Sequence, residues 1–466
     1  MKLAIVGAGL YGCYLAKKFA SLNMQVDLYE KNDEILKCAA TKNQSRLHYG
    51  FHYPRSKETI AQTIHGSKIF KQEMSESIFY PNKNYYAIHR DSDVNFETYL
   101  RVMDEFKLSY QQVDHKNMKI FADPTTIQGV INTNEGVIVL SRLEKTLLGW
   151  LRNSDVDVKT GTLVTNIDAV TGKIFIDGKS DVSDTYDWII NTTYTNPNLG
   201  LCDKKKFKVK YEIAGMALLR NDSLNNTAVT IMDGNFVSLY PRDRGLYTLS
   251  SVKYTPIKLL DSFEDFLAYS NEFSENINHE KYINVILKDA SKYLAASCLL
   301  GIENKMWIAP KVKIANDHDA TRVSSYIQNS KVLSVMCGKI DVIPLIFSEL
   351  RDQMSAIIVT GYNSNIAKNL IDILDEREDT QIIKAGRCKN ADIFVEFDRF
   401  DSIKKFAHSL REMSFSHFLI CHGVLYGEKI DSLDSSQCLG SFLVNLASVI
   451  SLLEELPNLK HRKTLV

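Results

Sequence analysis

The fold is decided by Lys2–Lys31, which reads KLAIVGAGLYGCYLAKKFASLNMQVDLYEK. It begins with a short apolar run, Leu3–Val6, which is typical of a strand buried on both faces. Apolar residues then recur every three or four positions over Leu10–Leu22, and this spacing predicts a helix. A second strand is predicted at Met24–Tyr29, directly before Glu30.

Three glycines between the first strand and the helix, Gly7, Gly9 and Gly12, have the spacing G-x-G-x-x-G. In nucleotide-binding units the first glycine permits a tight turn, the second lets the backbone approach a pyrophosphate, and the third lets the helix pack on the strand. The helix N-terminus adds unpaired N–H groups and a partial positive charge. Glu30 lies 18 residues after Gly12, about where an acid accepts hydrogen bonds from ribose hydroxyls. We predict a dinucleotide-binding unit; the alternative is an α/β unit that holds no nucleotide.

The composition narrows the class of protein. The chain has 466 residues, which suggests about two to three domains. Hydrophobic residues make up 45% and charged residues 24%, as in ordinary globular proteins. Lys plus Arg and Asp plus Glu both number 56, so the formal charge is zero and gives no support for nucleic acid or an anionic membrane as a partner. A small-molecule substrate is expected instead.

The eight cysteines are scattered and form no C-x-x-C pair. This is typical of reduced thiols rather than of a disulfide framework or a zinc site, so we expect a cytoplasmic protein without a metal. No apolar run reaches ~18 residues, and no membrane span is expected.

The most unusual segment is Thr41–Ser56, TKNQSRLHYGFHYPRS, which holds two His, two Tyr and two Arg. This composition is not that of an amphipathic helix, and Pro54 stops any regular element. Loops that gather polar and aromatic groups beside a nucleotide fold often carry the chemistry. We therefore expect the functional site here.

Together with the N-terminal unit, the run NQSRLHYGFHY resembles the D-amino-acid-oxidase superfamily of FAD-dependent oxidoreductases. It is similar in particular to the L-2-hydroxyglutarate and glycerol-3-phosphate dehydrogenase branches, which carry an Asn/Ser-rich loop ending in His-x-Gly near the flavin. The matching residues are Asn43, Ser45, His48 and Gly50. The resemblance covers about residues 1–352 and implies FAD as the cofactor.

Three later segments resemble the same superfamily. Val158–Ile167 is similar to the strand whose backbone contacts adenine, through Val164, and Trp188–Thr193 to the late FAD-domain strand, with Thr192 in place of a small residue. Val332–Asp341 is similar to the C-terminal strand and Gly-Gly-Lys turn that reaches the flavin. The resemblance implies cofactor contacts from Gly7, Gly9, Leu10, Tyr11, Gly12, Glu30, Lys31, Asn43, Ser45, Val164, Thr192, Gly338, Lys339 and Ile340.

The predicted fold class is α/β, with a Rossmann-type FAD-binding domain and an inserted antiparallel-sheet substrate domain. The FAD-binding parts are expected at about 1–75, 135–200 and 325–352, and the substrate sheet at about 76–134 and 201–324. Alternation over Lys206–Arg220 predicts a strand, and Asp233-Gly234 predicts a hairpin.

A partial Rossmann-like module is expected over residues 353–466, where Ala356–Leu374 resembles the start of short-chain dehydrogenases. Thr360 and Gly361 match that family's glycine motif, but Asn365 and Ala367 replace two glycines. The family's catalytic Ser and Tyr-x-x-x-Lys would lie beyond the last residue, so we expect a clipped or degenerate nucleotide fold. NAD(P) is a candidate ligand, through Gly361, Ser364 and Arg387.

Flavin oxidation of an alcohol or amine needs a base near neutral pH. His48 and His52 are the candidates, with Tyr53 beside them; the alternative is that either histidine only hydrogen-bonds the backbone or the flavin. Tyr240 is a candidate substrate contact, although a strand tyrosine more often packs. Arginines would bind a carboxylate or phosphate, and otherwise form structural ion pairs. The arginines in matching segments are Arg46, Arg55, Arg242 and Arg322.

The predicted function is therefore that of an FAD-dependent oxidoreductase. It would transfer a hydride to flavin from a small polar alcohol or amine, such as a hydroxy acid, amino acid or sugar derivative. The alternative is a non-catalytic flavin- or nucleotide-binding protein whose C-terminal module serves association.

Overall fold

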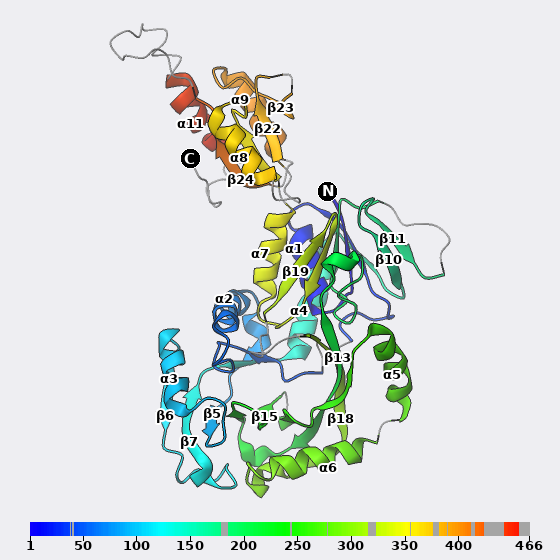
Figure 1. Cartoon of the computed structure of the whole chain (residues 1–466), viewed down its shortest axis with the longest axis vertical. Helices are drawn as coiled ribbons and strands as arrows, with labels where there is room; N and C mark the ends of the chain where they lie inside the picture. Colours follow the sequence, from blue (N-terminus) through cyan, green and yellow to red (C-terminus); the bar gives the residue numbers. More distant parts are fainter. Residues whose placement is uncertain are drawn as a thin grey trace. The chain divides into compact units, whose positions relative to one another are not determined.

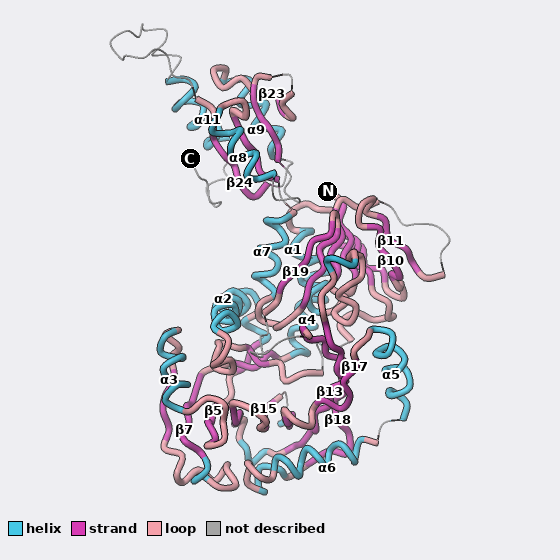
Figure 2. Tube along the Cα trace, viewed as in Figure 1, coloured by secondary structure: helices cyan, strands magenta, loops and turns pink. Residues whose placement is uncertain are grey.

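The computed structural model describes residues 1–37, 39, 42–178, 185–242, 245–276, 278–315, 323–354, 356–375, 382–388, 390–411, 415–423 and 442–455 (Figures 1 and 2). Arg322 and the last residues, Leu465-Val466, lie outside this part of the chain. The chain divides into two compact units, Met1–Phe347 and Ser348–Val466. The first unit contains a nucleotide-binding layer and a large second sheet.

The nucleotide-binding layer is a six-stranded sheet with the order β19-β20-β12-β1-β2-β9. Its pairs are parallel except the hairpin of β19 and β20. Four of the five residues of β1 are buried, as expected for a central strand. The strands are β1 (Lys2–Val6), β2 (Gln25–Tyr29), β9 (Val156–Lys159), β12 (Trp188–Asn191), β19 (Ser325–Asn329) and β20 (Val332–Met336).

Helices cover this sheet, and α1 begins directly after the glycine turn. Phe19 of α1 packs edge-on against Phe347 of α7, with ring centroids 5.1 Å apart. The N-cap of α2 is Ser56, whose side chain accepts a hydrogen bond from the Thr59 N–H. The helices are α1 (Leu10–Ala20), α2 (Lys57–Glu73), α4 (Leu140–Arg152) and α7 (Ile343–Gln353).

The second sheet has nine strands in the order β17-β13-β16-β15-β14-β5-β7-β6, and β18 also pairs with β13. Neighbours are antiparallel except β5 and β14, which are parallel. The hairpin predicted at Asp233-Gly234 joins β14 to β15, with Gly234 at φ +130°. The strands are β5 (Lys83–His89), β6 (Tyr110–Val113), β7 (Ile127–Thr133), β13 (Val209–Arg220), β14 (Thr227–Met232), β15 (Val237–Pro241), β16 (Leu246–Ser251), β17 (Pro256–Leu260) and β18 (Ile302–Ile314).

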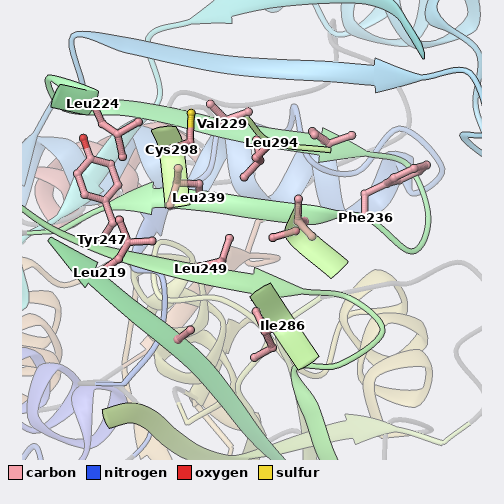
Figure 3. Close-up of a cluster of buried hydrophobic side chains, with 14 of the residues drawn as sticks. Leu219, Leu224, Val229, Phe236, Leu239, Tyr247, Leu249, Ile286, Leu294 and Cys298 are labelled. Atoms are coloured by element: carbon pink, nitrogen blue, oxygen red, sulfur yellow. The ribbon is translucent and has the colours of Figure 1, made fainter. Parts of the chain in front are cut away.

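The core of the second sheet lies between the strands and helix α6 (His279–Ala290). Figure 3 shows Ile286 of α6 together with Leu239 and Leu249 from the strands, all fully buried. The sheet is also accompanied by α3 (Phe96–Glu105) and α5 (Phe263–Asn276). The prediction of an α/β protein with an inserted, mainly antiparallel sheet is confirmed.

Short elements join the two layers. The predicted loop Thr41–Ser56 contains a two-residue strand, because Arg46 and Leu47 pair with Val137 and Gly136; the expectation of no regular element there was wrong. The short strands are β3 (Arg46–Leu47), β4 (Ile78–Phe79), β8 (Gly136–Ile138), β10 (Val164–Asp168) and β11 (Lys173–Ile176). The short helices are η2 (Ser75–Ser77), η3 (Pro124–Thr126), η4 (Asp203–Lys205), η5 (Asp222–Leu224) and η7 (Ala296–Leu299).

The C-terminal unit has its own parallel sheet, in the order β23-β22-β21-β24. The third, second, first and fourth strands along the chain thus lie side by side, as in one half of a Rossmann sheet. The elements are β21 (Ala356–Thr360), α8 (Asn365–Asp375), β22 (Ile382–Gly386), β23 (Ile393–Phe394), α9 (Phe400–Arg411), β24 (Phe415–Ile420), η9 (Leu443–Ala447) and α11 (Ser448–Glu455). Among the described residues, no helix combines the length and the apolar composition that crossing a bilayer requires.

Candidate functional site

A cavity of about 1030 Å³ lies in the N-terminal unit and is lined by residues from Val6 to Asp341. Most of the sequence-predicted site residues line it together, although they come from six separate segments. These are Gly7, Gly9, Leu10, Tyr11, Glu30, Lys31, Asn43, Ser45, Arg46, His48, His52, Tyr53, Val164, Thr192, Gly338, Lys339 and Ile340. Four predicted residues do not line it, namely Gly12, Arg55, Tyr240 and Arg242.

The glycine turn forms one end of the cavity. Gly7 has φ +100°, a conformation that favours glycine. A Cβ on Gly9 would meet nothing within 4 Å, whereas a Cβ on Gly12 would lie 1.9 Å from the Gly7 carbonyl oxygen. Gly9 therefore leaves space for a ligand, and Gly12 serves the packing of helix on strand. Helix α1 has no side-chain cap and no acid in its first turn, so its N-terminus is available to an anion.

Thr192 ties this turn to the neighbouring strand. Its hydroxyl is 3.0 Å from the Val6 carbonyl oxygen and 2.8 Å from that of Gly7. Thr192, which stands where the related sequences have a small residue, thus holds the glycine turn against β12.

Glu30 is buried at the end of β2 and accepts several hydrogen bonds. One carboxylate oxygen accepts from the Ala8 N–H at 2.9 Å, and the other from the Asn32 N–H at 3.0 Å. The carboxylate is therefore fixed at the cavity wall, next to the glycine turn.

The loop after β3 brings three aromatic side chains together. The ring of His48 lies 5.7 Å from that of His52 and 5.4 Å from that of Tyr53. His48 is buried, and its Nδ1 has no hydrogen-bond partner among the described residues. Burial lowers the pKa of His48 well below its ordinary value, and the charges of Lys339, His52 and Arg46 act in the same direction. His48 is therefore neutral near pH 7 and able to accept a proton.

Arg46 is a buried cation in the cavity wall. Its guanidinium lies over the Tyr240 ring, donates to Gln44 Oε1 at 2.7 Å and approaches His52 Nδ1 at 3.4 Å. Its Nε has no hydrogen-bond partner in the described chain, and the guanidinium interacts electrostatically with the buried Glu135. Tyr240 itself is buried behind Arg46, where its hydroxyl accepts from Asn84 Nδ2 at 2.8 Å. The predicted substrate contact Tyr240 thus supports Arg46 from outside the cavity.

The turn after β20 supplies Lys339, whose ammonium lies 4.0 Å from the centroid of the Tyr53 ring. The turn is held by Ser324, whose hydroxyl accepts from the Gly338 N–H at 2.8 Å, and by the Tyr11 hydroxyl, which donates to the Lys339 carbonyl. Asp341 follows, fully buried, and neither of its carboxylate oxygens has a hydrogen-bond partner among the described residues. Sequence reasoning missed Asp341, although its place two residues after Lys339 was a usable signal.

A second missed carboxylate, Glu135, lies behind the cavity wall. It accepts hydrogen bonds from the Tyr49 N–H at 2.6 Å and from the Tyr86 hydroxyl. Burial raises the pKa of Glu135 to about 7, although both hydrogen bonds and Arg46 oppose the shift. Nothing in its sequence context, a lone acid before Gly136, indicated this position.

Two predicted substrate-binding arginines lie elsewhere. Arg55 forms a two-pronged pair with Asp233, at 2.6 and 3.2 Å. Arg242 lies over the ring of Trp307, 5.0 Å from its centroid. Neither of the two lines the cavity.

The residues present fit FAD. The open position at Gly9 and the uncapped end of α1 suit a pyrophosphate, and the fixed carboxylate of Glu30 lies next to them. The cavity volume is large enough for a cofactor and a small substrate together.

Comparison with known proteins agrees with this geometry. Residues 2–308 match the family model "DAO: FAD dependent oxidoreductase". The chain therefore belongs to the DAO family of FAD-dependent oxidoreductases and is an enzyme, and the alternative of a non-catalytic binding protein is not retained. The chain is 27% identical over 349 residues to the FAD-dependent monooxygenase FPY4 of Fusarium mangiferae, covering 73% of this chain and 88% of that protein.

Solved structures show the same fold. Glycine oxidase from Geobacillus kaustophilus superimposes with a TM-score of 0.58 at 11% identity, over 76% of this chain and 94% of that one. L-α-glycerophosphate oxidase from Mycoplasma pneumoniae with FAD bound also superimposes with a TM-score of 0.58, at 17% identity. The match covers 75% of this chain and 93% of that one.

In the C-terminal unit, the predicted phosphate contacts are only partly grouped. Gly361 directly follows β21 and has φ +61°, and Ser364 caps α8 by accepting from the Ala367 N–H at 3.1 Å. Arg387 pairs at 3.7 Å with Asp398. His422, which was not predicted, follows β24; a Cβ on Gly361 would lie 2.5 Å from its Cα.

His422 fills the space between the ends of β21 and β24. Its Nδ1 lies 2.8 Å from Thr360 Oγ1 and its Nε2 2.9 Å from Ser448 Oγ, while its ring stacks on Phe397 at 3.5 Å. Burial lowers the pKa of His422 to about 4, so it is a neutral packing group at ordinary pH.

Proposed function

We propose that this enzyme oxidises a small polar alcohol or amine that also carries a carboxylate or phosphate. The observation that carries the proposal is Arg46, a buried guanidinium on the cavity wall whose Nε has no hydrogen-bond partner in the described chain. A buried charge needs a partner, and a guanidinium pairs with both anionic groups through two parallel hydrogen bonds. A hydroxy acid, an amino acid or a phosphorylated sugar derivative would supply that partner.

Each residue then has a defined role. Arg46 orients the anionic group of the substrate, and His48 accepts the proton of the hydroxyl or amine because its imidazole is neutral. Bound FAD supplies the oxidant, accepting a hydride from the substrate carbon. The rings of Tyr53 and of Tyr86, the latter from β5, lie 5.1 and 6.3 Å from the ring of His52 and hold it in place.

The test is anaerobic mixing of the FAD-loaded protein with a panel of hydroxy acids, amino acids and sugar phosphates, followed by absorbance near ~450 nm. A reducing substrate is expected among the anions, and its uncharged amide or ester should reduce the flavin at least tenfold less efficiently. Efficient reduction only by uncharged compounds would contradict the proposal. Oxygen uptake and an artificial electron acceptor, measured in parallel, distinguish an oxidase from a dehydrogenase.

Two variants separate the roles of the residues. Arg46→Met should raise KM for the anionic substrate much more than it lowers the limiting rate of flavin reduction, and Arg46→Lys should recover part of the affinity. His48→Gln should lower the limiting rate and leave KM nearly unchanged. His65→Gln, which alters an exposed histidine of α2 outside the cavity lining, is the matched control and should change neither value.

For the C-terminal unit, we propose that NAD(P) binds beside Gly361. The strand order supports this, because the ends of β21 and β24 meet at the position where Rossmann sheets bind their ligands. The packing of His422 in that space opposes it. Calorimetric titration of the full chain with NAD⁺ and NADP⁺, with Gly361→Val as the control, would decide: heat that persists in the variant, or none in either protein, would reject the site.

A further inference from the structure

The cavity wall contains one carboxylate whose role the proposed reaction does not use. Asp341 has 0% exposure, and both of its oxygens lack a hydrogen-bond partner among the described residues. A carboxylate buried in this way is strongly destabilising unless another charge offsets it or it takes up a proton. Its presence on the cavity wall therefore requires a reason.

The charged group that offsets Asp341 is Lys339, two residues earlier in the same turn. The Lys339 ammonium lies over the Tyr53 ring, and both residues line the cavity. Asp341 and Lys339 thus interact across a low-dielectric gap without forming a close ion pair. Burial lowers the pKa of Lys339 and raises that of Asp341, and each charge opposes the shift of the other.

The other groups that face this pair act on it in known directions. Arg46, from β3, lowers the pKa of Lys339 further, and His48 is itself disfavoured as a cation by Lys339. The charge of Glu135 raises the pKa of Asp341, and the charge of Asp341 in turn raises the pKa of Tyr11. Among these groups Asp341 is the one that favours a charged Lys339.

We propose that Asp341 is a positioning residue that keeps Lys339 protonated at the cavity wall, and thereby preserves a second cation beside Arg46. Two cations on one wall suit a ligand with a dianionic group, or one anionic group together with negative charge on the cofactor. When Asp341 is neutralised, Lys339 gives up its proton to solvent at a lower pH, and the wall loses one positive charge. This inference concerns the charge of Lys339 and stands independently of the substrate.

Competitive labelling of the full chain with acetic anhydride tests this, because the reagent modifies only neutral amines. Acetylation of Lys339 is measured by peptide mass spectrometry between pH 6 and 10, with and without added FAD. The wild-type midpoint should lie below the ~10.4 of an ordinary lysine. In Asp341→Asn it should fall by about one to three further pH units, and Asp341→Glu should stay near the wild type.

The matched control is Asp289→Asn, which alters a buried aspartate that does not itself line the cavity; it accepts from the hydroxyl of Ser251 and pairs with Lys292. Its Lys339 midpoint should equal that of the wild type. An unchanged midpoint in Asp341→Asn, or an equal shift in Asp289→Asn, would overturn the inference. Thermal melting identifies any variant that fails to fold. If Asp341→Asn fails to fold, the Lys339 midpoint of Asp341→Glu is compared with that of the wild type instead.

A second readout uses binding. Phosphate affinity, followed through the absorbance of bound FAD, should weaken at a lower pH in Asp341→Asn than in the wild type. In a Lys339→Arg background the same substitution should have no pH effect, because arginine stays charged. A pH shift that persists in that background would show that Asp341 acts by another route. If the proposed substrate class were wrong, the labelling result would be unaffected.

Discussion

The guanidinium of Arg46 lies over the aromatic ring of Tyr240, with its central carbon 4.1 Å from the ring centroid. The ring covers one face of the guanidinium, and the terminal nitrogens contact Gln44 and His52, which both line the cavity. Tyr240→Phe keeps the ring, so its KM for an anionic substrate should stay within about twofold of the wild type. Tyr240→Leu removes a cation–π contact of about 0.5–2 kcal/mol and should raise KM about 2- to 30-fold. Steady-state kinetics of the two variants checks this, and equal effects would contradict it.

The protonation of His48 gives a pH prediction. Because the pKa of His48 lies well below its ordinary value, the neutral base is already present at pH 6.5. The rate of anaerobic flavin reduction should therefore show no loss of activity near pH 6.5 and should fall only in more acidic solution. His48→Gln should lower this rate about 10²- to 10⁴-fold. Stopped-flow measurements from pH 5 to 9 test both statements, and a midpoint at 6.5 assigned to His48 would disprove the first.

Three glycines distinguish cofactor binding from packing. Gly9→Val should abolish retention of FAD while leaving the melting temperature of the apoprotein near that of the wild type, because the added atoms enter open space. Gly12→Ala should destabilise the apoprotein itself, since its Cβ would lie 1.9 Å from the Gly7 carbonyl. Gly149→Ala in α4 meets nothing within 4 Å and should stabilise by up to about 1 kcal/mol. Flavin content after gel filtration and thermal melts provide the measurements.

Glu135 predicts how stability depends on pH. Its pKa rises on folding from an ordinary 4.5 to about 7, so the folded chain binds more protons than the unfolded chain between these values. This contribution to stability is complete below pH 4.5 and is lost as the pH rises through 7. Glu135→Gln removes it, so the wild type should lose stability relative to the variant between pH 5 and 8. Urea unfolding at each pH gives the difference, and a constant difference would count against the assignment.

The parts of the site that could be predicted depend on local sequence. A few consecutive residues are enough to predict the glycine turn, Glu30 and the His48 loop, because turn geometry and unusual composition are local properties. The pairing of Arg46 with Tyr240 could not be predicted, since it depends on which face of β15 meets β3. Arg55 illustrates the same limit, because its neighbour Asp233 comes from a hairpin far along the chain.

Buried charge was the other quantity that sequence could not supply. Glu135 precedes a glycine and Asp341 follows two residues after Lys339, but neither context shows that the packing of distant segments removes the carboxylate from water. Thr192 differs from the small residue that the related sequences have at this position, so nothing in the sequence indicated a role for its hydroxyl. In the structure this hydroxyl donates to the Gly7 carbonyl and holds the glycine turn.

The cavity is lined by residues from Val6 to Asp341, and the strand beside β12 in its sheet is β20. During synthesis the glycine turn therefore leaves the ribosome long before its last wall segment exists. The chain must therefore be translated through Asp341 before the last wall segment of the cavity can form. We expect a chain that stops before this segment to retain no FAD, because it lacks the turn that contains Lys339.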